Sequence, residues 1–248
     1  MNYVRLIKID GVKFINEDYK NVIRYLLIYK GYLVIPAASL LAQFSKKKNW
    51  RFLKSATIAI FDSGLLTMLL KIFINSSIKK FSGYKFLGYL INDKSIQNKR
   101  VFSLDPNKVE LKANNQFLKK NFKFVKNYVC PLYTKNFFYD SKLKKEIKNF
   151  KPQIIIINIG GGVQEPLAYY LKNKINYKGI IICSGAAISF YTGHQAPIST
   201  FIDKMYMGWL IRILYKPKLL IRIVLSLKLF YYFFNYQIRV YNKFKVMN

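Results

Sequence analysis

Carboxylates are the side chains of this chain from which acid–base chemistry could be built. The sequence has a single histidine, His194, so Ser-His-Asp catalysis and histidine-rich metal sites are hard to assemble. Asp62 is the best candidate for a general base, because it follows the apolar run TIAIF and precedes the small residues Ser63 and Gly64. At such a strand end an α/β sheet opens toward its ligand. The alternative, that Asp62 is the N-cap of the next helix, is physically as good.

Apart from Glu165, each of the other carboxylates has a structural explanation. They are Glu17 and Asp18 at a helix start, Asp10, Asp93 and Asp105 in turns, Glu110, Asp140 and Glu146 in lysine-rich solvated segments, and Asp203 in a C-terminal helix. Glu165 stays ambiguous, because an acid in a first helical turn favours the helix whether or not it touches a ligand.

Two loops rich in small residues follow strand-like runs. The first, NIGGGVQE (158–165), has neither the GxGxxG spacing of dinucleotide-binding loops nor the Gly-Lys-Ser/Thr of a P-loop. Its unobstructed N–H groups at a helix start could still hold an anion. GAAISFYTG (185–193) is the second loop. On adjacent strand ends the two loops would make a site wide enough for a nucleotide and its sugar, although tight strand-to-helix packing explains either loop alone.

Strand-like and helix-like runs alternate through the first 200 residues. A β-hairpin over 3–15 turns at Asp10 and Gly11, and buried strands are expected at 32–36, 57–61, within KRVFSLDPN (99–107), at 154–159 and at 179–184. Helical spacing separates these runs. The alternation predicts a Rossmann-like α/β domain over residues 1–200, with a mostly parallel sheet, helices on both faces, and ligands at the carboxyl ends of the strands.

Residues 201–248 have a different pattern. Two helical stretches break at Pro217, and basic residues are threaded through aliphatic and aromatic ones. Their charge-free apolar stretches fall well short of the roughly 18 residues that a membrane-spanning helix needs. We therefore predict a C-terminal basic amphipathic helical appendage, which either lies on a membrane surface or packs on the domain with its lysines in water.

The composition favours an anionic partner. The 42 Lys and Arg residues exceed the 11 Asp and Glu residues and give a net charge of +31, which suits nucleic acid, an anionic membrane or a phosphorylated ligand. Coding bias of an AT-rich genome would explain part of the lysine content. Cys130 and Cys183 lie far apart and predict neither a disulfide nor a metal site, as in a reducing cytoplasm. The N-terminus lacks the apolar core of a signal peptide.

Residues 152–222 resemble the signature region of the WecG/TagA/CpsF glycosyltransferases, family 26. Those enzymes carry, after a strand, G-s-P-k-Q-E, then G-x-G-x-x-F-D-x-x-x-G, then R-A-P, then E-W-L-x-R-L with P-x-R-x-x-R-Y. In the same order this chain has GGGVQE (160–165), GAAISFYTG (185–193), QAP (195–197), GWLIRIL (208–214) and PKLLIR (217–222). Upstream, IAIFDSGLL (58–66) is similar to the family's I-x-x-x-D-G-x-G-x-x segment, so the resemblance covers most of the chain.

This resemblance implies an inverting transfer of a sugar, commonly an N-acetylhexosamine such as N-acetylmannosamine, from a UDP-sugar to a polyprenyl-diphosphate-linked acceptor. The product would enter cell-surface polysaccharide or teichoic acid, and the enzyme would be cytoplasmic and peripheral on the inner face of the membrane. The family works without a cofactor or a catalytic metal. Asp62 would be the catalytic base. Substrate binding would fall to Ser63, Gly64, Gly160, Gly161, Gly162, Gln164, Glu165, Gly185, Ala186, Ala187 and Phe190, and phosphate or lipid binding to Arg212, Lys218 and Arg222.

Several residues depart from the family pattern. The T-x-N element that contacts substrate corresponds to about Ile35, Pro36 and Ala37, and Ser189 replaces the Asp in the neighbourhood of the FD motif. A catalytically degenerate homologue therefore stays an alternative. A basic nucleic-acid-binding protein is a second one, which the missing RRM, KH and helix-turn-helix signatures disfavour. A nucleotide-binding oxidoreductase has the wrong glycine spacing. A homo-oligomer stays open.

Overall fold

Strands and helices alternate along the chain, as the sequence pattern predicts. The computed structural model describes residues 2–42, 47–74, 78–79, 81–133, 139–195, 224 and 240–247. The strands are β1 (Asn2–Ile9), β2 (Val12–Ile15), β3 (Gly31–Val34), β4 (Ile58–Ala59), β5 (Arg100–Asp105), β6 (Phe124–Val129), β7 (Ile154–Ile157), β8 (Ile180–Cys183) and β9 (Val240–Met247). The helices are α1 (Tyr19–Tyr29), α2 (Ala38–Leu41), α3 (Lys47–Lys54), α4 (Gly64–Ile74), α5 (Gly83–Asn92), α6 (Lys108–Lys119), α7 (Ser141–Phe150), α8 (Gln164–Asn173) and the 3₁₀ helix η1 (Gly185–Phe190).

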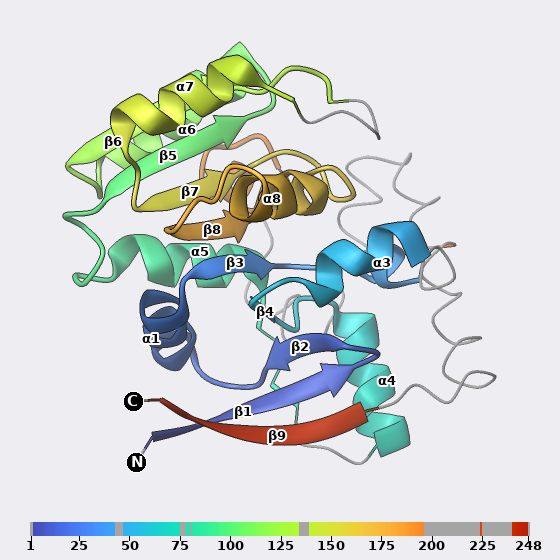
Figure 1. Ribbon diagram of the computed structural model, residues 1–248. Coiled ribbons are helices and arrows are strands. Elements are labelled where there is room, and N and C mark those ends of the chain that lie inside the picture. The colour runs from blue at the N-terminus through green and yellow to red at the C-terminus, as the bar shows by residue number, and fades with distance from the viewer. Residues whose placement is uncertain are drawn as a thin grey trace.

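The strands form one mostly parallel sheet (Figure 1). Among the described residues it has nine strands in the order β6-β5-β7-β8-β3-β4-β2-β1-β9. Pairing is parallel from β6 through β2, and antiparallel where β1 meets β2 and β9. The central strands β7 and β8 are buried at every position, which explains their unbroken apolar sequences. The predicted Rossmann-like α/β fold is confirmed.

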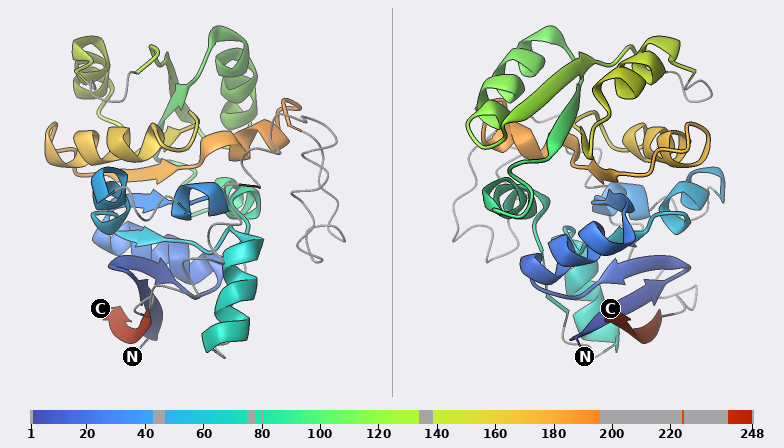
Figure 2. Two further views of the ribbon diagram at one scale, coloured as in Figure 1. Left: turned by 90° about the vertical axis from the view of Figure 1, so that its right-hand side faces the viewer. Right: turned by 60° about the vertical axis from the view of Figure 1, so that its left-hand side comes forward.

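Helices cover both faces of the sheet and enclose two cores (Figure 2). Successive side chains of a strand point to opposite faces, so Ile155 and Ile157 enter one core while Ile154 and Ile156 enter the other. Helices α3, α7 and α8 cover the first core, and α1, α5, α6 and η1 cover the second. The connections after neighbouring strands β7 and β8 therefore leave on opposite faces. Such a divergence leaves a crevice at the carboxyl ends of the strands.

Helix α5 and strand β6 were not predicted from the sequence. Helix α5 buries Phe86, Leu87, Leu90 and Ile91, but its two glycines weaken the helical pattern. Strand β6 lies at the edge of the sheet and is half-exposed, so its sequence FVKNYV carries lysine and asparagine in place of an apolar run. The predicted hairpin is confirmed. Asp10 and Gly11 have φ values of 42° and 88°, and this pair of positive angles matches a two-residue hairpin turn.

The predicted helical segment 201–248 is wrong for residues 240–247. Residues 240–247 form β9, which pairs antiparallel with the whole of β1 from Asn2 opposite Met247 to Ile9 opposite Val240. Within VYNKFKVM apolar and polar residues alternate only over KFKV (243–246), a short strand-like signal. The two chain ends consequently meet at one edge of the sheet (Figure 1). These eight residues belong to the sheet of the predicted 1–200 domain, and the helical appendage stays a prediction for the part of 201–239 outside the described residues.

Candidate active site

The predicted functional residues that the structure describes lie at the carboxyl ends of the parallel strands. Asp62 follows β4, the glycine loop 160–162 follows β7, and η1 follows β8. In the sheet, β3 and β8 separate β4 from β7. Neighbouring strands lie about 4.8 Å apart, so Asp62 and the glycine loop are separated by about 14 Å along this edge. A bound molecule touching both would have to be longer than a single sugar ring.

Asp62 does not cap the helix that follows it. Its Oδ1 accepts a hydrogen bond of 2.7 Å from the backbone N–H of Gly83, the first residue of α5, and the side chain is partly exposed. The cap of α4 is Ser63, whose Oγ accepts the N–H of Leu66 at 3.2 Å, ahead of Gly64 as the first helical residue. The N-cap explanation of Asp62 is therefore wrong for α4. The carboxylate instead joins the end of β4 to the start of α5.

The contact between Asp62 and α5 requires glycine at position 83. A Cβ on Gly83 would lie 2.8 Å from Cγ2 of Ile35 and 3.2 Å from its Cδ1. Ile35 directly follows β3, the strand beside β4, and is 8% exposed. The residues next to Asp62 on this side, Ile35, Pro36 and Ala37, carry no hydroxyl or amide side chain.

The glycine loop is open on its outer side. Gly160 and Gly161 are exposed, and a Cβ added at Gly160 or Gly162 would meet no atom within 4 Å. Gly162 has a φ of 89°, which explains glycine there. However, the N–H of Gly162 donates to Oε2 of Glu165 at 2.7 Å. The donor that we expected to be free for an anion is already occupied by a carboxylate of the same loop.

Gln164 and Glu165 connect the two small-residue loops. They are 3% and 2% exposed. Gln164 Oε1 accepts the N–H of Gly185 at 2.8 Å, and its Nε2 donates to Glu165 Oε1 at 3.0 Å. Burial raises the pKa of Glu165 above its usual value. The pair thus holds the glycine loop against η1, and its direct contact with a substrate stays a prediction.

Helix η1 begins at Gly185 and presents one exposed small residue to solvent. Gly185 has a φ of 56°, Ala186 is exposed, and Ala187 is 7% exposed. Phe190 is half-buried and packs against Tyr84 of α5 with ring centroids 5.3 Å apart. Of the predicted binding residues in the two loops, Gly160, Gly161 and Ala186 are exposed, and Gly162 and Phe190 are partly exposed.

Asp105 and Asp140 are buried, although the sequence predicts a turn at Asp105 and a solvated segment at Asp140. Asp105 is fully buried at the end of β5, and Asp140 is 9% exposed at the N-terminus of α7. Asp140 accepts hydrogen bonds from the hydroxyls of Tyr128 and Tyr133 and from the N–H of Leu143. The burial of Asp140 could not be predicted from its lysine-rich surroundings, because its tyrosine donors lie earlier in the chain.

Glu110 also differs from its predicted environment. It is half-buried in the first turn of α6, where its Oε1 accepts from Asn107 at 3.0 Å and its Oε2 from Ser189 of η1 at 3.3 Å. Five described carboxylates follow strands β4, β5, β6 and β7 at the carboxyl side of the sheet, at a strand end or at the start of the next helix. They are Asp62, Asp105, Glu110, Asp140 and Glu165. Within the described chain, both oxygens of the other four accept hydrogen bonds, whereas Oδ2 of Asp62 accepts none.

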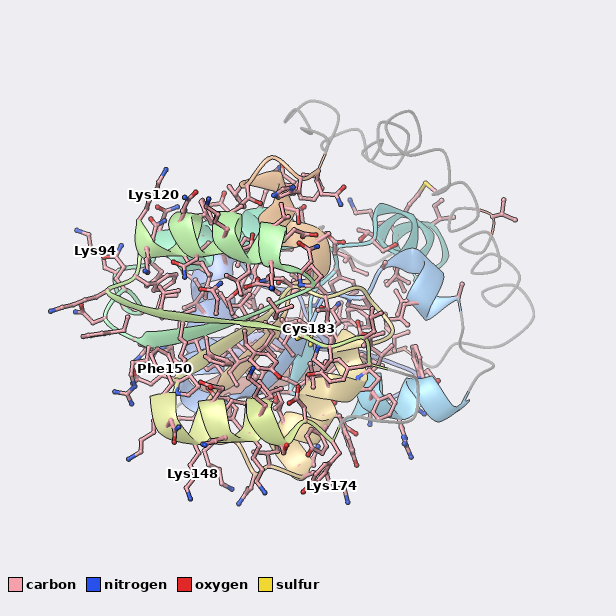
Figure 3. All side chains as sticks on the ribbon, turned by 90° about the horizontal axis from the view of Figure 1, so that it is seen from above. Lys94, Lys120, Lys148, Phe150, Lys174 and Cys183 are labelled. Atoms are coloured by element: carbon pink, nitrogen blue, oxygen red, sulfur yellow. The ribbon has the colours of Figure 1, made fainter. Side chains whose placement is uncertain are left out.

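The positive charge of the protein is spread over its surface. Figure 3 shows Lys94, Lys120, Lys148 and Lys174 pointing outward from the helices and loops, while Cys183 lies inside. Two ion pairs occur among the described side chains, Lys54 with Asp10 and Lys126 with Glu146. Most lysines there have no acidic partner, because the carboxylates cap helices or take part in internal hydrogen bonds. Both cysteines are free and buried, and burial raises the pKa of the Cys130 thiol to about 12.

Three predicted residues, Arg212, Lys218 and Arg222, lie outside the described residues. In the part of the chain that the structure describes, no helix is long and apolar enough to cross a membrane. The same part contains no group of three or more His, Cys, Asp or Glu side chains placed to hold a metal ion.

Comparison with known proteins gives the chain its family. No curated protein matches the sequence closely enough to be counted as a relative. The model of the glycosyl transferase WecG/TagA/CpsF family matches residues 7–243, nearly the whole chain, and spans the strand-end site from Asp62 to η1. The chain therefore belongs to the WecG/TagA/CpsF glycosyltransferase family and is a glycosyltransferase of polysaccharide synthesis.

Proposed function

We propose that the protein transfers an N-acetylhexosamine, such as N-acetylmannosamine, from a UDP-sugar to a polyprenyl-diphosphate-linked acceptor, with Asp62 as the general base. The observation that supports this most is the free oxygen of Asp62. Among the five described carboxylates that follow β4, β5, β6 and β7 at a strand end or a helix start, Asp62 is the one that keeps an oxygen without a hydrogen bond and is also partly exposed. A base must meet both conditions, because it has to accept a proton from a substrate.

The chemistry requires one proton acceptor and a stabilised leaving group. The acceptor hydroxyl attacks the anomeric carbon while Oδ2 of Asp62 takes its proton, and the bond from the anomeric carbon to the diphosphate breaks. The electron pair of that bond leaves with UDP. Attack opposite the leaving group inverts the anomeric centre. The hydrogen bond from Gly83 holds the carboxylate through Oδ1 and leaves Oδ2 to accept the proton.

The geometry of the strand ends supports a donor that runs along the sheet edge. With its reacting sugar at Asp62, a nucleotide sugar would extend over the ends of β3 and β8 toward the glycine loop, about 14 Å away. The open outer side of Gly160 and Gly161 leaves space for it. The N–H of Gly162 is occupied by Glu165, so charge compensation for the diphosphate is assigned to the predicted cations Arg212, Lys218 and Arg222.

We further propose that the enzyme works at the inner face of the cell membrane. Its acceptor would carry a lipid, and a protein with a net charge of +31 is attracted to anionic lipids. The predicted amphipathic stretch within 201–239 would supply the apolar contact. Replacing Arg212, Lys218 and Arg222 together by glutamate should weaken sedimentation with phosphatidylglycerol vesicles at least tenfold. Vesicle binding that stays at the wild-type level would contradict the tail model, because each lysine or arginine near an anionic surface contributes about 1 kcal/mol.

The decisive experiment is a transfer assay with lipid-linked acceptors and a panel of UDP-sugars, run with Asp62→Asn. Asparagine can still accept the N–H of Gly83, so the fold should stay intact while the proton acceptor is lost. We expect turnover to fall by a factor of 100 or more, within the range of general-base catalysis. Asp18→Asn is the matched control, because Asp18 likewise accepts a backbone N–H at a helix start, that of Asn21 in α1. An active Asp62→Asn enzyme would remove Asp62 from this role.

A degenerate transferase is the second candidate. The observation that favours it is the apolar sequence Ile35, Pro36 and Ala37 beside Asp62, where the family's T-x-N element contacts substrate. Such a protein would bind a UDP-sugar and fail to transfer it to any acceptor. Calorimetric titration of the same UDP-sugar panel, compared with the transfer assay, distinguishes binding without turnover from catalysis.

A further inference from the structure

The buried Asp105 lies at the centre of a polar network that crosses the strand ends. Its Oδ1 accepts hydrogen bonds from Ser103 Oγ at 2.8 Å, Asn114 Nδ2 at 2.7 Å and Asn158 Nδ2 at 2.9 Å. Its Oδ2 accepts from Asn127 Nδ2 at 2.7 Å. Asp105 and Asn114 are fully buried. Four donors thus replace the water that the carboxylate loses on folding.

The network follows the order of the strands in the sheet. Asn127 lies on β6, Asp105 ends β5, Asn158 directly follows β7, and Ser184 directly follows β8. The Ser184 hydroxyl lies 2.7 Å from its acceptor Oδ1 of Asn158 and 3.0 Å from a second acceptor, the carbonyl oxygen of Ile157. One continuous line of side-chain hydrogen bonds therefore links the carboxyl ends of four adjacent strands, and it runs through the carboxylate of Asp105.

Both loops of the candidate site start from this line. The residue after Asn158 is Ile159, and the glycine loop begins one position later, while Ser184 immediately precedes Gly185 of η1. Farther out, Gln164 and Glu165 connect the same two loops through the N–H groups of Gly185 and Gly162. The loops are thus fixed relative to each other at their bases, through Ser184 and Asn158, which Asp105 holds, and a second time through Gln164 and Glu165.

A buried carboxylate without a cation is a costly way to obtain stability alone. None of the hydrogen-bond donors to Asp105 in the described chain is a lysine or arginine, although the protein carries 42 of them. Packed apolar side chains of similar volume often replace buried charges without loss of stability. A fully satisfied polar network, in contrast, fixes one geometry. The arrangement suits a site in which the glycine loop and η1 must keep a fixed distance from each other.

We propose that Asp105 is a positioning residue of the transferase site: through Asn158 and Ser184 it sets the distance between the glycine loop and η1, and thereby the affinity for the sugar-nucleotide donor. This inference rests on the proposed function for its ligand. Asp105 touches no substrate in this role, because it is completely buried. Its loss should therefore raise the KM for the donor far more than it lowers kcat.

The test compares Asp105→Asn with Asp140→Asn. Both replace a buried carboxylate that accepts several hydrogen bonds, but Asp140 has no bond to the line from Asn127 to Ser184. We expect Asp105→Asn to raise the donor KM at least tenfold with kcat within threefold of wild type, and Asp140→Asn to leave the KM unchanged at a similar loss of thermal stability. A KM that rises equally in both variants, or in neither, overturns the proposal.

Two further variants keep the test independent of the folding of Asp105→Asn. Ser184→Ala removes the link to Asn158 Oδ1 and leaves all four donors of Asp105 in place, so we expect a donor KM three- to tenfold above wild type. Ser184→Thr keeps the hydroxyl and should restore the wild-type KM. An unchanged KM in Ser184→Ala would contradict the role of the link.

Amide hydrogen exchange separates this inference from the proposed function, because it needs no substrate. Exchange at Gly162 and Gly185 should accelerate at least tenfold in Asp105→Asn and Ser184→Ala and stay at the wild-type rate in Asp140→Asn. Unchanged exchange at both glycines refutes the positioning role whatever the donor is. Faster exchange in a protein that binds no UDP-sugar would support the positioning role and refute the proposed donor.

Discussion

Adding one methyl group at Gly83 tests whether catalysis depends on the anchor of Asp62. The Cβ of Gly83→Ala would lie 2.8 Å from Ile35 Cγ2 and 3.2 Å from Ile35 Cδ1, whereas carbon atoms pack at about 3.5–4.0 Å. The start of α5 must therefore retreat from Ile35 by several tenths of an ångström or more, or Ile35 must leave its rotamer. A retreat of about 0.7 Å would stretch the bond from Gly83 N to Asp62 Oδ1 from 2.7 Å to beyond normal hydrogen-bond length.

We expect a moderate loss of stability and a larger loss of activity. Overpacking costs about 1–3 kcal/mol, and alanine is the better helix former by up to about 1 kcal/mol, so the free energy of unfolding should fall by about 1–2 kcal/mol. A base displaced by about 1 Å can lose about 100-fold in rate. Steady-state transfer assays should give a kcat about 10- to 100-fold below wild type. Gly160→Ala is the stability control, since its Cβ meets no atom within 4 Å.

A second substitution tests whether the clash with Ile35 causes the loss of activity in Gly83→Ala. Ile35→Ala removes both atoms that the new methyl group would meet, so Gly83→Ala combined with Ile35→Ala should recover the kcat of Ile35→Ala alone. Its stability should fall further, because truncating a buried isoleucine costs about 2–5 kcal/mol. A folded Gly83→Ala enzyme with wild-type kcat, or a double variant that stays as slow as Gly83→Ala, would refute the idea that the clash acts through Asp62.

Three other predictions concern burial, a hydrogen bond and the last strand. Burial raises the pKa of Glu165 in the folded state, so its contribution to stability is fully present below the unfolded pKa of about 4.3 and is lost as the pH rises through the folded pKa. Urea unfolding should show that the wild type loses stability relative to Glu165→Gln over that pH range. The same pH dependence of stability in both proteins would contradict this. Tyr128→Phe removes a hydroxyl that donates to Asp140, and urea unfolding should show a loss of about 1.5–3 kcal/mol, with an unchanged midpoint as the contrary result. A chain ending at residue 239 lacks β9, so exchange of the β1 amides that pair with it should accelerate while β7 stays protected; protected β1 amides would show that the pairing with β9 contributes little.

The sequence was sufficient to predict the central architecture, because the relevant signals are local. The runs at 32–36, 57–61 and 154–159 have no alternation, which a strand buried on both faces requires, and their ends carry the predicted Asp62 and glycine loop. Strand β9 was missed for the opposite reason. An edge strand gains its stability from its partner β1, which is more than 230 residues away in the chain, and its alternating residues occur within a longer basic and aromatic segment.

The role of Asp62 could not be resolved from the sequence, since Asp62 and Ser63 are both good N-cap residues and stand next to each other. The structure assigns the cap of α4 to Ser63 and gives Asp62 a partner 21 positions later, at Gly83. The same limit explains why Asp105 was taken for a turn residue. Its donors Asn114, Asn127 and Asn158 are dispersed over more than forty residues, and each looks like an ordinary polar residue in its own segment.

The buried carboxylates explain why a chain with a net charge of +31 can still offer a base at its site. Lysines cover the surface and could pair with any exposed acid, yet Asp105, Asp140 and Glu165 are held by amides, hydroxyls and backbone N–H groups. Oδ1 of Asp62 is likewise held by a backbone N–H and not by a lysine. An N–H group on a helix terminus fixes the carboxylate without covering its second oxygen, whereas a flexible ammonium group could reach both. If a lysine held Asp62 in place of the N–H of Gly83, its ammonium group would make the carboxylate a weaker proton acceptor. The backbone contact from Gly83 is therefore the feature on which the proposed chemistry most depends.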